Sequence, residues 1–138
     1  MGLGPNGVVF KGCLLQGTAS YTLGDIVTVT GDATVALAQT VNALTPIGVI
    51  QEDVLNAFLV AHTGVVFANI AFSGLVRVNA GAAVAIGDRV TNDATNRAVT
   101  RVRAIAGAQP MPTFGIALTS ASAAGQQIDV QLTPGASF

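Results

Sequence analysis

The segment DIVTVT, residues 25–30, decides the fold class. Its valines, Val27 and Val29, alternate with Ile26 and two threonines, and alternation with a period of two is typical of a half-buried β-strand. A glycine and an aspartate follow directly, and this pair marks a turn. The segment therefore predicts a short strand that ends in a tight turn, and the rest of the chain repeats this pattern.

The second half of the chain resembles the first half. Three blocks occur twice in the same order: LGDIVT (23–28) and IGDRVT (86–91), DAT (32–34) and DAT (93–95), IGVI (47–50) and FGIAL (114–118). These matches favour an internal duplication with repeat-like halves at about residues 20–60 and 80–132. The alternative is that strands rich in Thr, Ala and Val resemble one another by chance.

Strand-like runs separated by turn residues fill the remaining sequence, and the last of them, QIDVQL at 127–132, again alternates. Many short strands of this kind predict an all-β fold, a compact β-sandwich or barrel. At most one short helix fits, at 51–61, and the sequence leaves open whether 54–61 is helix or strand. We expect a single β domain over 12–138, preceded by an extended N-terminal arm at 1–11.

Charged side chains are scarce, with 6 basic and 7 acidic residues among 138 and a net charge of −1. This balance offers no basic surface for nucleic acid. A free monomer of this mass exposes on the order of 6,600 Å², and so few charges cannot cover it. We therefore expect a subunit that buries surface against copies of itself or a larger partner.

One stretch without a formal charge, residues 54–76, is long enough to cross a bilayer. Polar residues and glycines interrupt it, and its second half is rich in strand-forming residues, so we expect no membrane span. The chain starts without the basic and apolar regions of a signal peptide. These features predict a soluble protein made in the cytoplasm.

The sequence contains a match to one nucleotide-binding motif, but the surrounding residues do not support nucleotide binding. GLGPNG at 2–7 matches GxGxxG, yet it does not follow a strand, and Pro5 would break the helix that this motif must open. Lys11, the one lysine of the sequence, lacks the frame of a phosphate-binding P-loop. We expect no nucleotide cofactor and no ATPase activity.

His62, the one histidine, is the sole candidate general base. An enzyme with a site around His62, Asp53 and Ser73 is an alternative, but no set of nucleophile, base and orienting group is visible. Cys13 fits a small core residue, and the aspartates stand in turns, where they cap backbone N–H groups. We therefore expect no catalytic, cofactor-binding or metal site.

Five segments, taken in order, resemble the capsid cement (head decoration) proteins of tailed phages: GDIVTV (24–29), PIGVIQED (46–53), SGLVRV (73–78), IGDRVTND (86–93) and FGIALTSASAAGQQIDVQL (114–132). Members of this family have sometimes been labelled RecA-like recombinases, a label that the missing P-loop contradicts. Two parts have no counterpart that we can match, residues 1–7 and 54–71.

The resemblance implies a compact β-rich subunit, commonly a homotrimer, on the outer surface of a phage capsid. Its partner there would be the major capsid protein, and its function to stabilise the shell as part of the virion. Another structural β subunit of a phage, a head fibre or a tail component, is the alternative.

Two groups of contact residues are expected. Capsid contacts are expected from the arm and from the arginine cluster: Pro5, Asn6, Val8, Phe10, Lys11, Arg97, Arg101 and Arg103. Contacts between copies are expected from a strand at 65–72 with two apolar sides: Val66, Phe67 and Phe72. The arm could add a strand to a neighbouring subunit, or be a frayed terminus. The arginines could instead form a solvated edge that prevents aggregation.

Overall fold

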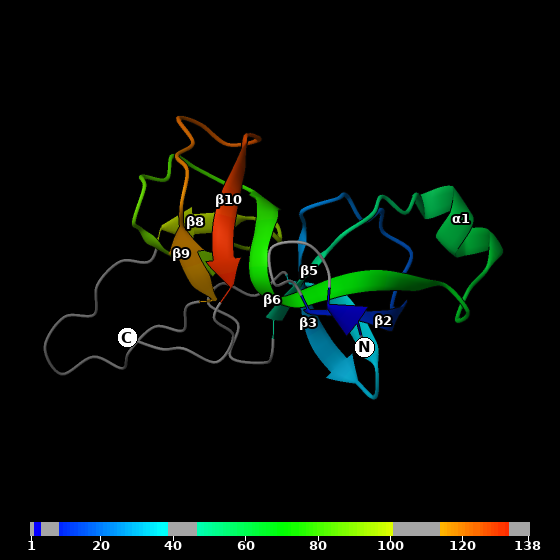
Figure 1. Ribbon diagram of the computed structural model, residues 1–138. Coiled ribbons are helices and arrows are strands. Elements are labelled where there is room, and N and C mark those ends of the chain that lie inside the picture. The colour runs from blue at the N-terminus through cyan, green and yellow to red at the C-terminus, as the bar shows by residue number, and fades with distance from the viewer. Residues whose placement is uncertain (1, 4–8, 39–46, 101–113, 133–138) are drawn as a thin grey trace, which may run out of the picture.

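The computed structural model describes residues 2–3, 9–38, 47–100 and 114–132, which form an all-β fold with one short helix among them (Figure 1). This confirms the predicted fold class. The elements are β1 (Gly2–Leu3), β2 (Val9–Leu15), β3 (Ile26–Gly31), β4 (Thr34–Leu37), β5 (Ile47–Ile50), α1 (Asn56–Ala61), β6 (Phe67–Asn79), β7 (Arg89–Asn92), β8 (Ala98–Thr100), β9 (Gly115–Ala117) and β10 (Gln127–Leu132).

The first barrel has five strands in the order β2-β4-β3-β5-β6, and β6 pairs back with β2 to close it. All of these pairings are antiparallel except β2 with β4, which is parallel through Leu14 and Leu15. The alternation of β3 sends Val27 into the barrel, where it packs with Tyr21 and Ile70. Closure pairs both sides of each strand, so this barrel leaves no long open edge.

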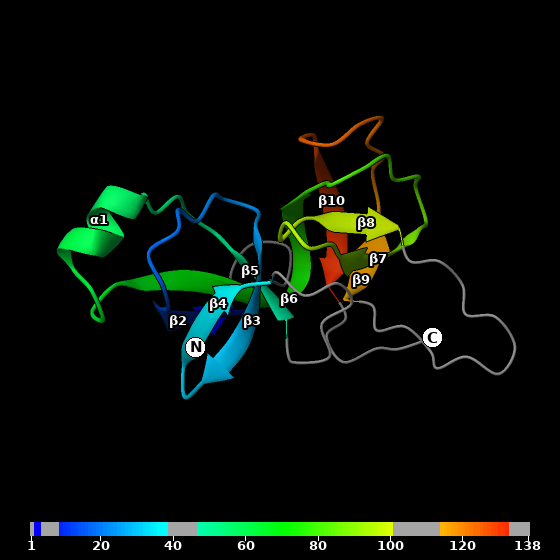
Figure 2. The same cartoon turned by 180° about the vertical axis from the view of Figure 1, so that it is seen from behind.

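The second barrel repeats this arrangement with the second half of β6, followed by β10, β9, β7 and β8. A parallel bridge between Ala80 and Ala98, just beyond the end of β6, completes the ring. Figure 2 shows β7 to β10 gathered on one side of the molecule, with β2 to β5 on the other. The two barrels therefore share the single strand β6.

The two barrels have the same geometry at the turn before the first hairpin of each. Oδ2 of Asp25 accepts the N–H of Thr22 at 2.9 Å, and Oδ2 of Asp88 accepts the N–H of Ala85 at 2.9 Å. The preceding glycines both have positive φ, +93° at Gly24 and +86° at Gly87. A left-handed residue in this turn favours glycine, because a residue with a Cβ is strained at positive φ.

The sequence match between the two DAT triplets is out of register. In β3–β4, Val29 pairs with Val35, and the equivalent pair in β7–β8 is Asn92 with Ala98. The non-glycine residue with positive φ in the first turn is Ala33, and its counterpart is Asn96 rather than Ala94. The three letters recur by chance, whereas the strand pairing shows the true equivalence.

Strand β6 spans 13 residues and changes barrel at Gly74. Before this residue it pairs with β2 and β5, and from it onward with β10. Gly74 has a φ of +97°, and the register of β2 against β6 shifts nearby, between Val9 and Phe10. A left-handed glycine redirects the strand from one barrel to the other.

The two barrels pack directly against each other. Ile26 and Val49 of the first barrel belong to the same buried cluster as Val78 and Ile128 of the second. The side-chain amide of Asn79 donates to Oδ1 of the buried Asp25 at 3.0 Å and to the carbonyl of Leu23 at 3.1 Å. Apolar packing and satisfied buried polar groups thus fix the barrels against each other.

Two expectations about local structure need correction or completion. The arm predicted at 1–11 is too long, because β2 begins at Val9 and Lys11 pairs with Ile70. Gly2 and Leu3 are also not free, since they pair with β2 as β1, while residues 4–8 lie outside the described residues. The open question at 54–61 resolves as a helix that starts at Asn56, after Val54 has bridged to Tyr21.

Replacing Gly74 with alanine is expected to destabilise the protein by about 1–2 kcal/mol, because a Cβ is strained at positive φ. The matched control is Gly12→Ala in β2, where an added Cβ meets nothing within 4 Å. Urea unfolding followed by circular dichroism measures both changes. Equal unfolding midpoints for the two variants would contradict the prediction that a Cβ is strained at Gly74.

Tyr21, the single tyrosine, is expected to make stability sensitive to alkaline pH. Its hydroxyl donates to the carbonyl of Gln16 at 2.6 Å, and burial raises its pKa from the ordinary tyrosine value of about 10 to about 12. The stabilisation from the neutral phenol is complete below the unfolded pKa and is lost as pH rises towards the folded one. Absorbance titration of the phenolate reads the folded pKa directly.

Tyr21→Phe tests the same side chain at neutral pH. The variant loses the bond to Gln16, which costs about 1 kcal/mol. It should also lose the part of alkaline destabilisation that comes from the phenol. A phenolate that titrates near pH 10 in the folded protein would contradict this assignment.

Candidate interaction surfaces

Large apolar side chains are exposed around helix α1, at the end of the molecule away from the second barrel (Figures 1 and 2). Among the helix residues, Leu59 alone is buried. Five side chains of this region are between 51% and 67% exposed, and we call them the α1 patch: Leu55, Phe58, Val60, Val65 and Phe67. Large exposed apolar side chains gathered at one end of a molecule can mark a contact surface.

A few specific contacts hold α1 against the first barrel. The backbone N–H of Asn56 donates to Oγ of Ser20 at 2.8 Å, and the Asn56 side chain donates to the carbonyl of Thr18. Leu59 packs into the first core. The helix is therefore docked through Asn56 and Leu59, while Leu55, Phe58 and Val60 remain exposed.

The ring of His62 stacks on Phe58 with the centroids 4.3 Å apart, and its Nδ1 lies 3.0 Å from the carbonyl of Phe58. Asp53, the carboxylate suggested for an enzyme site, accepts the N–H of Leu23 through Oδ1 at 2.6 Å. Ser73 lies in β6. Each of these residues has a separate structural contact or position, and the described residues do not bring them together as a catalytic set.

The predicted capsid contacts fall in different places. Lys11 is exposed on β2, whereas Arg97 is partly buried at the turn before β8, where its N–H donates to Oδ1 of Asp93 at 3.0 Å. Phe10 pairs through its backbone with Ala71. The other members of the group lie outside the described residues: Pro5, Asn6, Val8, Arg101 and Arg103. Lys11 and Arg97, the two cations of this group that the structure describes, therefore lie in different barrels.

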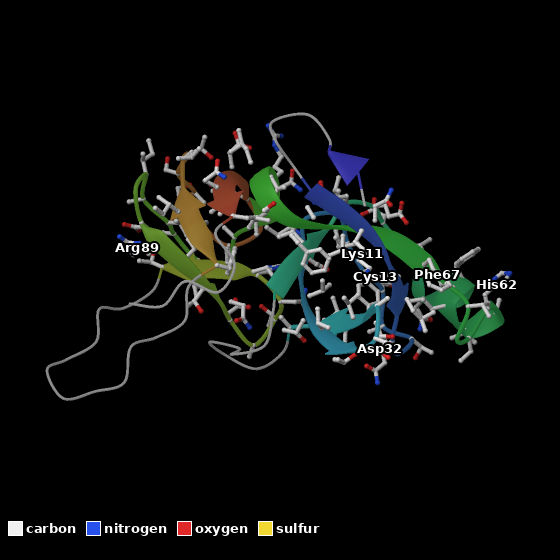
Figure 3. All side chains as sticks on the ribbon, turned by 60° about the horizontal axis from the view of Figure 1, so that its bottom comes forward. Lys11, Cys13, Asp32, His62, Phe67 and Arg89 are labelled. Carbon is white, nitrogen blue, oxygen red and sulfur yellow. The ribbon has the colours of Figure 1, made fainter. Side chains whose placement is uncertain are left out.

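The expected contact strand at 65–72 is corrected in part. Val66 is 7% exposed and packs in the first core, so its side chain is not on the surface. Phe72 is partly buried against the same core. Phe67 remains exposed and lies at the same end of the molecule as His62 (Figure 3). The sequence showed two apolar sides, but barrel closure turns one of them inward.

The exposure of the helix was not predicted from the sequence. A short helix was expected at 51–61, and a short amphipathic helix normally buries its apolar face. Only Leu59 is buried here, because the helix touches the barrel through one turn. The available signal was the uncharged stretch 54–76, which left no polar face to oppose an apolar one.

Other candidate sites offer little chemistry. A shallow hollow of about 370 Å³ opens at the mouth of the first barrel, lined by Leu14, Leu15, Gln16 and a ring of threonines and glycines. Cys13 is buried, and burial raises the pKa of its thiol. Within the described ranges, no group of three His, Cys, Asp or Glu side chains is placed to hold a metal ion. In the same ranges, no helix is long and apolar enough to cross a membrane.

Comparison with known proteins shows a fold relationship. Neither a scan against protein-family models nor a search of curated proteins finds a match. Among solved structures, the chain is similar to the head fibre gp8.5 N base in bacteriophage phi29, with 19% sequence identity and a TM-score of 0.62. The match covers 91% of this chain and 94% of that one, so both barrels are included. At this identity the similarity shows a shared fold.

Proposed function

We propose that the protein is a structural subunit of a phage virion that attaches to the outer surface of the capsid. The observation that carries the proposal is the fold shared, over nearly the whole of both chains, with the base of a phage head fibre. The sequence resemblance to capsid cement proteins points to the same class. The scarcity of charged residues, 9% of the chain, also fits a subunit that buries surface in an assembly.

Two positions on the capsid are compatible with this class. As the base of a head fibre, the protein would anchor further mass to the shell, and the solved neighbour favours this role. As a cement subunit, it would stabilise the shell itself. Binding only to the assembled shell adds interface free energy to that state and none to free capsid protein. We place the head fibre role first and the cement role second.

The partner in either role is the major capsid protein, and we propose a non-catalytic function. Asp53 and His62 are engaged with Leu23 and Phe58, which supports structural roles for them. We propose that Lys11, the exposed cation on β2, contributes to capsid attachment. An exposed charge in an interface rim affects attachment modestly.

Co-sedimentation with capsids that lack the protein tests this function. Saturable binding at a fixed number of copies per capsid is expected. Lys11→Ala should weaken binding roughly 2- to 5-fold, because it removes one rim charge. The matched control is Arg77→Ala, which removes a cation from an exposed pair with Asp129 on the second barrel and should not alter binding. Absence of any capsid binding would contradict the proposed function.

Capsid stability then separates the two roles. Bound cement raises the temperature at which the shell releases its DNA, whereas a fibre base leaves it nearly unchanged. The measurement is dye-detected DNA release from capsids with and without the bound protein.

A further inference from the structure

We propose that the turn at 85–88 in the second barrel is a docking surface for a strand end of another virion protein, and that this protein is the major capsid protein. Five residues around the turn form this surface, which we call the outer turn surface: Ile86, Gly87, Asp88, Arg89 and Leu118. The inference rests on the function proposed above, to which it adds the place and the chemistry of the contact.

The first barrel shows what a turn of this kind binds. Its equivalent turn, at 22–25, receives Asn79 from the end of β6. The backbone N–H of Asn79 donates to the carbonyl of Gly24 at 3.0 Å. The Asn79 side-chain amide donates to the carbonyl of Leu23 at 3.1 Å and to Oδ1 of Asp25 at 3.0 Å. The turn therefore offers three acceptors to a single asparagine, and each acceptor is satisfied.

The outer turn surface offers the same three acceptors. The N–H of Gly87 donates to the carbonyl of Ala117 at 2.8 Å, as that of Gly24 does to Ile50 at 3.0 Å. The N–H of Ala117 donates to the carbonyl of Asp88 at 2.9 Å, and Ile50 makes the same bond in the first barrel at 3.0 Å. Together with the matching aspartate bonds and positive φ values given above, these bonds place the three acceptors alike in both turns.

No part of the described chain covers these acceptors in the second barrel. Among the described residues, none donates a hydrogen bond to the carbonyl of Ile86 or Gly87, or to Oδ1 of Asp88. A Cβ added at Gly87 would meet nothing within 4 Å. Arg89 lies on the side of the second barrel that faces away from the first barrel (Figure 3). The acceptor set that holds the barrels together at one turn therefore lacks a partner within the described chain at the other.

Exposed apolar side chains flank this turn. Ile86 is 70% exposed and Leu118 is 47% exposed. Each is the chain neighbour of a residue in the bond between Gly87 and Ala117, so both lie beside the same turn. A strand end can cover such a surface, because it supplies backbone N–H donors and apolar contacts together.

A second copy of this chain does not supply the matching donor. In the second barrel, Asn79 precedes Ala80, which bridges in parallel to β8. In the first barrel, the equivalent parallel pairing with β4 involves Leu15, so the residue in the position of Asn79 is Leu14. Leucine has no side-chain amide. The occupant is therefore a different protein, whose strand end carries an asparagine or a comparable amide.

Charge adds a second requirement. Ile26 pairs with Val49 in the first barrel and is buried in the cluster that joins the two barrels. The equivalent residue of the second barrel is Arg89, which pairs with Ile116. A partner that covers the outer turn surface as the second barrel covers the first would enclose this guanidinium, and a buried cation requires a carboxylate beside it. The partner's strand end therefore carries an acidic residue near the amide.

Co-sedimentation with capsids that lack the protein tests this contact. Asp88→Asn keeps one oxygen for the N–H of Ala85 and replaces the outer acceptor by a donor, so capsid affinity should fall roughly 10-fold. Arg89→Glu sets like charges against each other and should weaken binding about 10-fold, more strongly at low salt. The matched control is Asp32→Asn, which changes an exposed aspartate in a turn of the first barrel and should leave the affinity unchanged.

A thermal melt shows whether each variant is folded. If Asp88→Asn does not fold, Ile86→Ser replaces it, because this exposed side chain can be changed without opening the core, and it should weaken binding by a similar factor. Wild-type protein that binds capsids, together with any one of these folded variants that binds as tightly, overturns the inference and leaves the proposed function intact. Wild-type protein that binds no capsid contradicts both.

Discussion

The fold depends on one strand, β6, which forms backbone hydrogen bonds in both barrels. β6 provides the last wall of the first barrel and the first wall of the second, and each half needs hydrogen-bonding partners on both sides. A regular strand would keep one twist along its length, whereas Gly74 allows a left-handed step between the halves. The relative placement of the barrels follows from this step and from the shared apolar cluster around Ile26 and Val78.

The shared strand also bears on the composition of the surface, which carries few charged residues. Sharing a strand removes one pair of open edges, and Val, Ile and Ala side chains fill most of both interiors around Tyr21 in one core and Phe114 in the other. Few charged residues are then needed inside or between the barrels, and Asp25 is buried there with its turn and Asn79 as partners. The exposed large apolar side chains among the described residues are those of the α1 patch together with Leu23, Ile86 and Leu118.

Much of the fold was predictable because strand alternation and Gly-Asp turns are local signals. Residues 25–30 predicted β3, and the recurrence at 86–91 predicted β7 in an equivalent barrel. The sharing of β6 was not predictable, since two adjacent segments, 67–73 and 74–79, read equally well as separate strands. The contact residues were harder still. Val66 and Phe67 are neighbours of similar apolarity, and only barrel closure decides that one is buried and the other exposed.

Strand sharing also determines how the molecule responds to mechanical load. A flexible linker between two domains would let them separate under tension at little cost. Here the chain that connects the barrels is itself hydrogen-bonded along both halves, to β2 and β5 on one side of Gly74 and to β10 on the other. Pulling the barrels apart therefore requires many backbone hydrogen bonds of β6 to break at the same time. The two barrels thus transmit force as one rigid body.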